Sequence, residues 1–195
     1  MSVTLANAGS KTERPATDFY PTPREVTTAI LDYLKLPRSS GIWEPACGEG
    51  NMVNVMRERG YEVQSGDILH GQDFLETTNC RVESDWIITN PPFYLAEKFI
   101  RRAFALNPRG FAFLLKSQYW HSSKRLALFD AIPPKAVLPL TWRPDFLFGS
   151  KSGSPTMEVL WTVWERGNKE ETIYRPISRP RKASKTRKNS RELTI

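Results

Sequence analysis

The sequence contains few of the residues and runs that define several large classes of protein. Two of its 195 residues are cysteine, Cys47 and Cys80, and two are histidine, so neither a disulfide framework nor a metal-type cluster is indicated. No apolar run approaches the roughly 18 residues that a membrane-spanning helix needs. Residues 1–17 contain no apolar stretch, so no secretory signal is expected. These features fit a protein of a reducing compartment.

Glycine-rich phosphate-binding motifs are missing as well. The sequence contains neither GxxxxGK[ST] nor GxGxxG, which excludes a P-loop and the dinucleotide fingerprint. Its content of 39% hydrophobic and 25% charged residues is ordinary for a globular protein. With 195 residues, we expect one domain with a substantial core.

The net charge of +7 is concentrated at one end of the chain. Residues 175–195 contain eight Lys/Arg and one Glu, whereas residues 1–174 contain 20 basic and 20 acidic residues. The 175–195 segment has too few apolar residues to fold alone. Basic tails of this kind commonly bind nucleic-acid phosphate, and a tail that only aids solubility is the alternative.

Hydrophobic periodicity predicts alternating strands and helices over most of the chain. Helical spacing is found in residues 24–36 and 94–106, and helices are also expected over residues 49–59 and 121–131. Strand-like runs occupy residues 41–43, 61–65, 86–89, 111–115, 136–140 and 157–165. This alternation is typical of βα units, which build a mostly parallel sheet covered by helices on both faces. We therefore expect one α/β domain over 18–174, between a flexible arm at 1–17 and a disordered basic tail at 175–195.

Two unusual motifs follow predicted strands. EPACGEG (44–50) comes after the first strand, and NPPF (90–93) comes after the strand at 86–89. Glycines allow a tight turn and a close approach to a ligand, and two prolines fix the backbone of the second motif. Ligands of open α/β sheets bind at the carboxyl ends of strands, so both motifs should lie at one site.

In this order the motifs resemble those of the S-adenosylmethionine-dependent amino-methyltransferases. They are most similar to the compact N6-adenine DNA methyltransferases carried by phages and prophages. The resemblance covers about residues 18–165 and rests on four short motifs in the family's order. It implies a Rossmann-like class I fold with a mostly parallel seven-stranded sheet, S-adenosylmethionine as cofactor, and DNA as partner. It also implies a cytoplasmic protein of a bacterium or a phage-infected host cell, with no metal and no membrane association.

The resemblance implies roles for individual cofactor-binding residues. DFYPTP (18–23) is similar to the motif that touches the methionine part of the cofactor, and Asp67 stands where the family binds the ribose hydroxyls. Asp73 and Phe74 resemble the pair that contacts the cofactor adenine. The cofactor-binding residues implied in this way are Tyr20, Thr22, Glu44, Ala46, Gly48, Gly50, Asp67, Asp73 and Phe74.

The same resemblance makes Asn90, Pro91, Pro92 and Phe93 the catalytic residues. An adenine amine is a poor nucleophile because its lone pair is delocalised into the ring. Two acceptors, the Asn90 side-chain oxygen and the Pro91 carbonyl, would hold both amino hydrogens and stabilise the positive charge that develops on nitrogen. Phe93 would stack on the target base, which must flip out of a duplex to reach the site.

Residues that follow the predicted strand at 111–115 should lie on the same side of the sheet as NPPF. We expect nucleic-acid contacts there and in the tail, from Lys116, Ser117, Tyr119, Lys124, Arg125, Arg179, Arg181 and Lys182. We find no segment of several dozen residues that would form a target-recognition domain. Sequence reading would therefore fall to the loops at 116–125 and 143–156.

Other substrates and one other class of protein stay open. The same motif serves amino groups of RNA bases, cytosine N4 and protein glutamine. Phe93 favours adenine, because glutamine enzymes usually show NPPY and cytosine enzymes more often carry Ser in the first motif position. A non-catalytic nucleic-acid-binding protein on the same fold is the further alternative, and the intact glycines and NPP core argue against it.

Overall fold

The computed structural model describes residues 20–78, 86–146 and 157–181. Its strands form one sheet in the order β2-β1-β3-β4-β6-β5-β7. Neighbouring strands are parallel except at β6, which runs antiparallel to both β4 and β5. The strands are β1 (Gly41–Glu44), β2 (Glu62–Ser65), β3 (Trp86–Thr89), β4 (Gly110–Lys116), β5 (Ala136–Pro139), β6 (Val159–Glu165) and β7 (Ile173–Tyr174). The predicted mostly parallel, seven-stranded sheet is confirmed.

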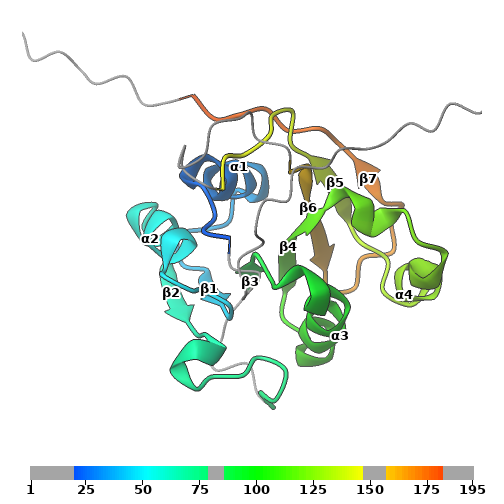
Figure 1. Cartoon of the computed structure of the whole chain (residues 1–195), viewed down its shortest axis with the longest axis horizontal. Helices are drawn as coiled ribbons and strands as arrows, with labels where there is room; N and C mark the ends of the chain where they lie inside the picture. The colour runs from blue at the N-terminus through cyan, green and yellow to red at the C-terminus, as the bar shows by residue number, and fades with distance from the viewer. Residues whose placement is uncertain (1–19, 79–85, 147–156, 182–195) are drawn as a thin grey trace, which may run out of the picture.

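Helices cover both faces of the sheet, as Figure 1 shows. Helices α1 (Arg24–Leu34) and α2 (Asn51–Glu58) pack on one face, and α3 (Ala96–Leu106) and α4 (Leu126–Ala131) pack on the other. Short 3₁₀ turns precede or join these elements: η1 (Ile68–His70), η2 (Phe93–Leu95), η3 (Ser117–Trp120) and η4 (Ser123–Arg125). The result is a three-layer α/β/α sandwich with an apolar core on each side of the sheet.

Two tryptophans of β6 fasten the helical layers to the sheet from opposite sides. Trp161 and Trp164 are three residues apart in a strand, so their side chains point to opposite faces. The Trp161 indole donates to the Val26 carbonyl of α1 at 3.1 Å, and the Trp164 indole donates to the Ile132 carbonyl just after α4 at 3.0 Å. Both are almost fully buried, so they are packing residues.

All four predicted helices are longer than the observed α-helices, and the structure explains the difference for α1 and α4. Helix α1 ends at Leu34 because Lys35 adopts a left-handed conformation with φ of 49° and donates its backbone N–H to Leu31. Within the predicted helix at 121–131, the 3₁₀ turn η4 is followed directly by α4, which is the only α-helical part. Leu128 is the one buried residue of α4, so little packing supports a longer helix.

The folded part extends beyond residue 174, where the sequence predicts the domain to end. The Arg175 and Ile177 amides donate to carbonyls of β5, so the chain continues alongside that strand. Strand β7 itself was not predicted, because two exposed residues carry no periodic pattern. Of the predicted tail at 175–195, residues 182–195 lie outside the part of the chain that the structure describes, as does the predicted arm at 1–17.

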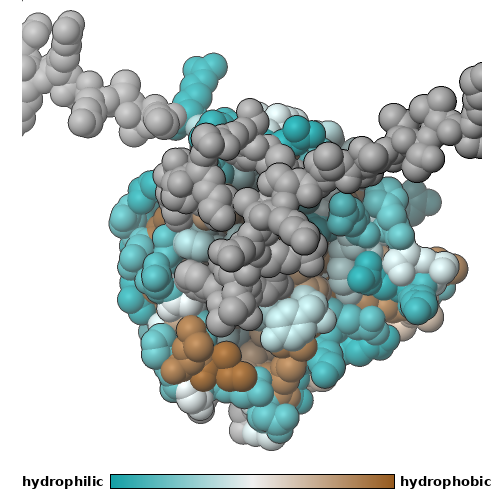
Figure 2. Space-filling model, viewed as in Figure 1, coloured by the Kyte–Doolittle hydropathy of each residue, from teal (hydrophilic) through white to brown (hydrophobic). Residues whose placement is uncertain are grey.

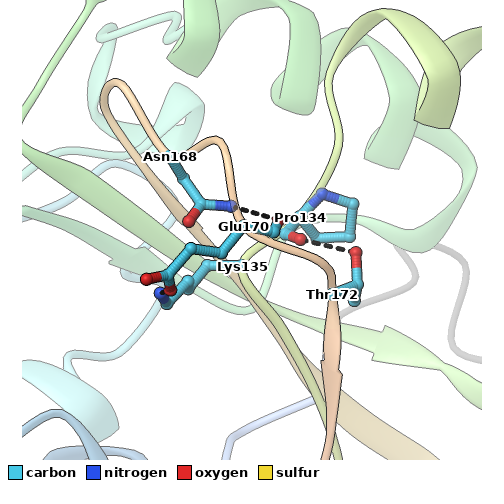
Figure 3. Close-up of polar contacts among 5 residues, drawn as sticks. All are labelled: Pro134, Lys135, Asn168, Glu170 and Thr172. Carbon is cyan, nitrogen blue, oxygen red and sulfur yellow. Dashed lines mark hydrogen bonds and ion pairs between the residues drawn. The ribbon is translucent and has the colours of Figure 1, made fainter.

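Side-chain contacts hold β7 against β5 at the edge of the sheet (Figure 3). Lys135 forms an ion pair with Glu170, and the Thr172 hydroxyl donates to the Pro134 carbonyl at 2.7 Å. The Asn168 side-chain amide donates to the Glu170 carbonyl at 3.2 Å within the preceding turn. These contacts set the path along which the chain passes β5 toward Arg179.

The parallel strands bring five loops to one edge of the sheet. The carboxyl ends of β1, β2, β3, β4 and β5 all face this edge, so the segments that follow them lie near one another. The segments after β1 and β3 are the EPACGEG and NPPF motifs of the sequence. Within the described ranges, no helix is long and apolar enough to cross a membrane.

The close contact between β3 and β4 explains why β4 begins with glycine. Trp86 and Gly110 are register partners in these strands, and a Cβ added to Gly110 would lie 2.5 Å from the Trp86 ring. We expect Gly110→Ala to lower the free energy of unfolding by about 1–3 kcal/mol, because Trp86 is buried and cannot move without disturbing the core.

A double-mutant cycle in urea unfolding checks this cause. Trp86→Phe removes the ring atoms that the new methyl group would meet, so the cost of Gly110→Ala should be smaller in that background. An equal cost in both backgrounds would contradict the steric explanation.

Candidate active site

A cavity of about 660 Å³ opens at the carboxyl edge of the sheet. Its wall is built by the loops after β1, β2 and β3 and by the chain before α1. Of the residues that the sequence singles out, those that line this cavity are Tyr20, Thr22, Glu44, Ala46, Gly48, Asp67, Asp73, Phe74, Asn90, Pro91, Pro92 and Phe93. Residues separated by up to 73 positions in the chain therefore meet in one place.

Asn90 follows β3 directly, and its side chain is held in a defined orientation. Its amide nitrogen donates to the Tyr20 carbonyl at 3.3 Å and to the Thr22 hydroxyl at 3.0 Å. A backbone carbonyl can only accept, so the nitrogen must face Tyr20 and the oxygen must face the other way. That oxygen, Oδ1, is buried and accepts no hydrogen bond from the described residues. An oriented acceptor without a donor is thus present in the cavity wall.

Asp67 fixes the shape of the glycine loop after β1. One of its carboxylate oxygens accepts from the Gly48 amide at 2.8 Å, and the other accepts from the Leu69 amide at 2.9 Å. Gly48 has φ of 49°, a left-handed conformation that L side chains rarely adopt. The loop after β1 and the loop after β2 are consequently joined through a single carboxylate.

Gly50 lies outside the cavity wall, unlike the other predicted cofactor-binding residues. It is the residue before α2, with φ of 81°, and it is not among the residues that line the cavity. A left-handed residue here lets the chain turn directly into α2, and the amide of Asn54 then bonds to the Gly50 carbonyl at 2.9 Å. Gly50 shapes the loop through its conformation.

Glu44 is a buried carboxyl group in the cavity wall. One oxygen accepts from the Thr89 hydroxyl and, at 3.4 Å, from the Ala46 amide, whereas the other, Oε2, has no partner among the described residues. Burial raises the pKa of Glu44 from its usual 4.5 to about 8, and the nearby charge of Asp67 adds to the rise. The hydrogen bonds from Thr89 and Ala46 lower the pKa but do not offset the effect of burial. A cationic ligand at this oxygen would favour the ionised form.

Asp73 and Phe74 lie in the turn that follows η1. The Asp73 carboxylate accepts from the Leu75 amide at 2.8 Å and so shapes the turn. Phe74 is 3% exposed, and its ring packs against Trp43 and Phe99 with centroid distances of 5.2 and 4.8 Å. Phe74 thus belongs to the core as well as to the cavity wall.

Exposed apolar side chains at the cavity wall were missed by the sequence reasoning. Ile68 and Leu69 of η1 are 66% and 72% exposed, and Tyr94 of η2 is 75% exposed. Figure 2 shows a hydrophobic patch over the segment that follows β2. Their positions in the sequence could have identified them, because Ile68 directly follows Asp67 and Tyr94 directly follows Phe93, and both neighbours are predicted site residues. Burial of such surface by a ligand would be favourable.

The predicted nucleic-acid residues that the structure describes fall into three groups. Lys116, Tyr119 and Arg125 line a second, smaller pocket that also contacts Phe93. Ser117 and Lys124 lie in adjacent turns, outside the lining of either pocket. Arg179 pairs with Glu25 in the first turn of α1 at 2.6 Å, and Arg181 is exposed. Lys182 lies outside the described residues.

Comparisons with known proteins bear on the fold. No protein-family model and no curated protein matches this sequence. A solved structure of a protein assigned as the modification subunit of a type I restriction enzyme from Vibrio vulnificus YJ016 is similar, with a TM-score of 0.57 at 15% identity. The match covers 80% of this chain and 47% of that one, so this chain spans about half its length.

A second similar structure is the 23S rRNA methyltransferase ErmE, with a TM-score of 0.55 at 12% identity, covering 77% of this chain and 71% of that one. A third, assigned as a hemolysin from Lactococcus lactis, has a TM-score of 0.55 at 9% identity, covering 77% and 91%. At these identities the likeness shows the fold alone. The chain has the Rossmann-like class I methyltransferase fold.

The raised pKa of Glu44 leads to a prediction about stability. Between pH 4.5 and 8 the unfolded chain has released this proton while the folded protein keeps it. We therefore expect the free energy of unfolding to fall as the pH rises through this window, by at most about 1.4 kcal/mol per pH unit, and to level off above pH 8.

Urea unfolding of the ligand-free protein from pH 5 to 9 measures this dependence. Glu44→Gln keeps an acceptor for Thr89 and cannot ionise, so this variant should lack the decrease. Glu62→Gln, which changes an exposed carboxyl group of the neighbouring strand β2, should follow the wild-type profile. A wild-type profile for Glu44→Gln would show that Glu44 does not titrate in this range.

Proposed function

We propose that this protein is an S-adenosylmethionine-dependent methyltransferase that methylates the N6 amino group of adenine in DNA. The observation that carries the proposal is the Asn90 side chain. Its Oδ1 is a buried acceptor without a donor, and its nitrogen is tied to Tyr20 and Thr22 at the start of NPPF. An amino group that enters the cavity would supply the missing donor.

The charges of the large cavity fit the proposed cofactor. The acidic residues Glu44, Glu49, Asp67 and Asp73 line it, and among the described residues of its wall there is no Lys or Arg. S-adenosylmethionine carries a sulfonium and an ammonium group, so an acidic, lysine-free wall suits it better than it would suit a nucleoside polyphosphate. The partnerless oxygen of Glu44 is the natural acceptor for the ammonium group.

The chain's own residues would then prepare the amine for attack. When bound, S-adenosylmethionine supplies an electrophilic methyl group on its sulfonium. Asn90 Oδ1 and the Pro91 carbonyl would each accept one amino hydrogen, which turns the nitrogen lone pair toward the methyl carbon. The amine held in this way would take the methyl group and release its surplus proton to solvent. The rigid prolines keep both acceptors aimed at the charge that develops on nitrogen.

The choice of adenine in DNA rests on the family resemblance and on charge. Phe93 ends the motif as it does in the N6-adenine enzymes, and the cationic residues Lys116 and Arg125 lie beside it. The similar structures include one that is named as a 23S rRNA methyltransferase and one that is assigned as a restriction-enzyme modification subunit. RNA is therefore the second substrate to test, and protein glutamine is the third.

A methyl-transfer assay tests the proposal. Purified protein is incubated with labelled S-adenosylmethionine and unmethylated plasmid DNA, and the DNA is digested to nucleosides for mass spectrometry. We expect N6-methyladenine. If calorimetry shows that the protein binds the cofactor but no methyl group is found in the DNA, DNA is refuted as the substrate. RNA and protein would then be tested in the same assay. Absence of both labelling and cofactor binding would refute the enzyme and leave a non-catalytic scaffold.

Asn90→Ala should lower turnover by about two orders of magnitude or more, because the variant loses an acceptor that acts on the charge of the transition state. Cofactor affinity should change by no more than a few-fold, since Asn90 is proposed to face the amine. Rates come from the assay above and affinity from calorimetry. Asn54→Ala, an exposed position on α2 outside the cavity wall, is the matched control. A wild-type rate for Asn90→Ala would contradict the role given to it.

Deletion of residues 182–195 should weaken DNA binding and flatten its salt dependence. The deleted segment contains five Lys/Arg, so the slope of log K against log salt should become less steep by up to about 4. Residues 175–181 are kept because residues 175 and 177 pair with β5.

A full-length variant with these five residues changed to Gln separates charge from length. It should behave like the deletion in the same titration. An unchanged slope in both variants would show that the tail makes no phosphate contacts.

A further inference from the structure

A second pocket, of about 140 Å³, lies next to the large cavity. Phe93 lines both, so the aromatic ring proposed to stack on the target base forms part of the wall between them. The pocket is lined by Phe93, Ala96, Leu115, Lys116, Gln118, Tyr119 and Arg125. These residues come from η2, from the start of α3, from the end of β4, and from the turns η3 and η4.

The charge of this pocket is opposite to that of the large cavity. Lys116 and Arg125 contribute two cations to the wall, and no Asp or Glu is among its described residues. The nearest acid of α3, Glu97, accepts two hydrogen bonds from Arg101, at 2.8 and 3.0 Å, so its charge is already paired. The two pockets on either side of Phe93 therefore favour ligands of opposite sign.

Both cations are held in place by contacts within the protein. Arg125 donates to the Tyr119 carbonyl at 2.7 Å, and its guanidinium carbon lies 3.8 Å from the Tyr119 ring centroid. The Lys116 ammonium lies 4.4 Å from the centroid of Phe93. Cation–π contacts of this kind orient the groups without neutralising their charge, so an anion would meet a largely prearranged site.

Tyr119 adds an unpaired polar group to the same wall. The residue is 6% exposed, and its hydroxyl has no hydrogen-bond partner among the described residues. Burial raises the pKa of Tyr119 to about 12, so the hydroxyl keeps its proton at neutral pH and can donate it. A buried donor without an acceptor is costly unless a ligand supplies one.

The donor chemistry distinguishes a phosphate from a base. Lys and Arg side chains have only donors, and phosphate oxygens only accept, whereas the edge of a base presents both donors and acceptors. We propose that this pocket binds one backbone phosphate of the strand that carries the target nucleotide, through Lys116, Tyr119 and Arg125. The inference rests on the proposed function for the identity of the strand, and it places the phosphate directly beside the ring that stacks on the flipped base.

The first test needs DNA binding and no turnover. Binding of a labelled DNA duplex is measured by fluorescence anisotropy between 50 and 300 mM salt, roughly the range over which phosphate contacts are resolved. Lys116→Gln and Arg125→Gln should each weaken binding on the order of tenfold and reduce the salt slope by about one. Lys169→Gln makes the same charge change in the turn after β6, which lies near the amino ends of the parallel strands and so away from both pockets. This variant should leave both the affinity and the salt slope unchanged.

The second test locates the phosphate. In duplexes that contain the adenine that the protein methylates, each phosphate near this adenine is replaced in turn by an uncharged methylphosphonate. Wild-type protein should lose affinity at one particular phosphate. Lys116→Gln and Arg125→Gln should be insensitive to that replacement and remain sensitive to the others, whereas Lys116→Arg should restore the wild-type pattern.

The outcomes separate this inference from the proposed function. Unchanged salt slopes, or equal sensitivity of all variants at every phosphate, would overturn the phosphate site even when methylation proceeds normally. Removal of the target base is the remaining control. If the wild-type protein loses affinity for such a duplex, the variants do not, and no phosphate replacement distinguishes them from wild type, the pocket binds the base and the inference is overturned. The proposed function fails separately, in the absence of cofactor binding and methyl transfer by the wild-type protein.

Discussion

The hydrogen bonds of the Asn90 side chain are the constraint on which the candidate site depends. They join the end of β3 to the chain before α1, across 68 and 70 residues of sequence. Because both bonds use the amide nitrogen, the buried carbonyl oxygen is left without a donor among the described residues. The sheet supplies the rigid support, since β3 is buried on both faces between β1 and β4. A chain that lost both anchors would still have an Asn at this position, without a single orientation for it.

Charge is divided around Phe93 in a way that fits the cationic methyl donor and the nucleic acid that we propose as ligands. The large cavity has acidic residues and no Lys or Arg in its described wall, whereas the small pocket has Lys116 and Arg125 and no Asp or Glu. A cationic methyl donor and an anionic nucleic acid would otherwise compete for the same surface, because each would be attracted to any mixed site. An aromatic ring between the two pockets provides an uncharged surface on which a base can stack.

Parts of this architecture could be predicted from single residues, and other parts could not. The bounds of β3 agree with the prediction because an apolar run buried on both faces has a clear pattern. The helix predicted over 121–131 is α-helical only from residue 126, because apolar residues in a sequence do not show how many will be buried, and Leu128 is the one buried residue of α4. Strand β7 depends on pairing with β5 and has no pattern of its own. Phe74 could be assigned to a ligand or to the core from sequence, and its packing against Trp43 and Phe99 requires the fold.

The amino-acid sequence by itself determined the chain order of the first six strands and of the four helices, the class of fold, the motifs at two strand ends and the separation of basic charge into the tail. These are local properties, because periodicity, turn chemistry and composition act over a few residues. Only the tertiary structure decided which oxygen of Asn90 is free to accept, which oxygen of Glu44 lacks a partner, and on which side of Phe93 the cations lie. Each of these depends on contacts between residues far apart in the chain, and the packing of the sheet and its helices sets those contacts.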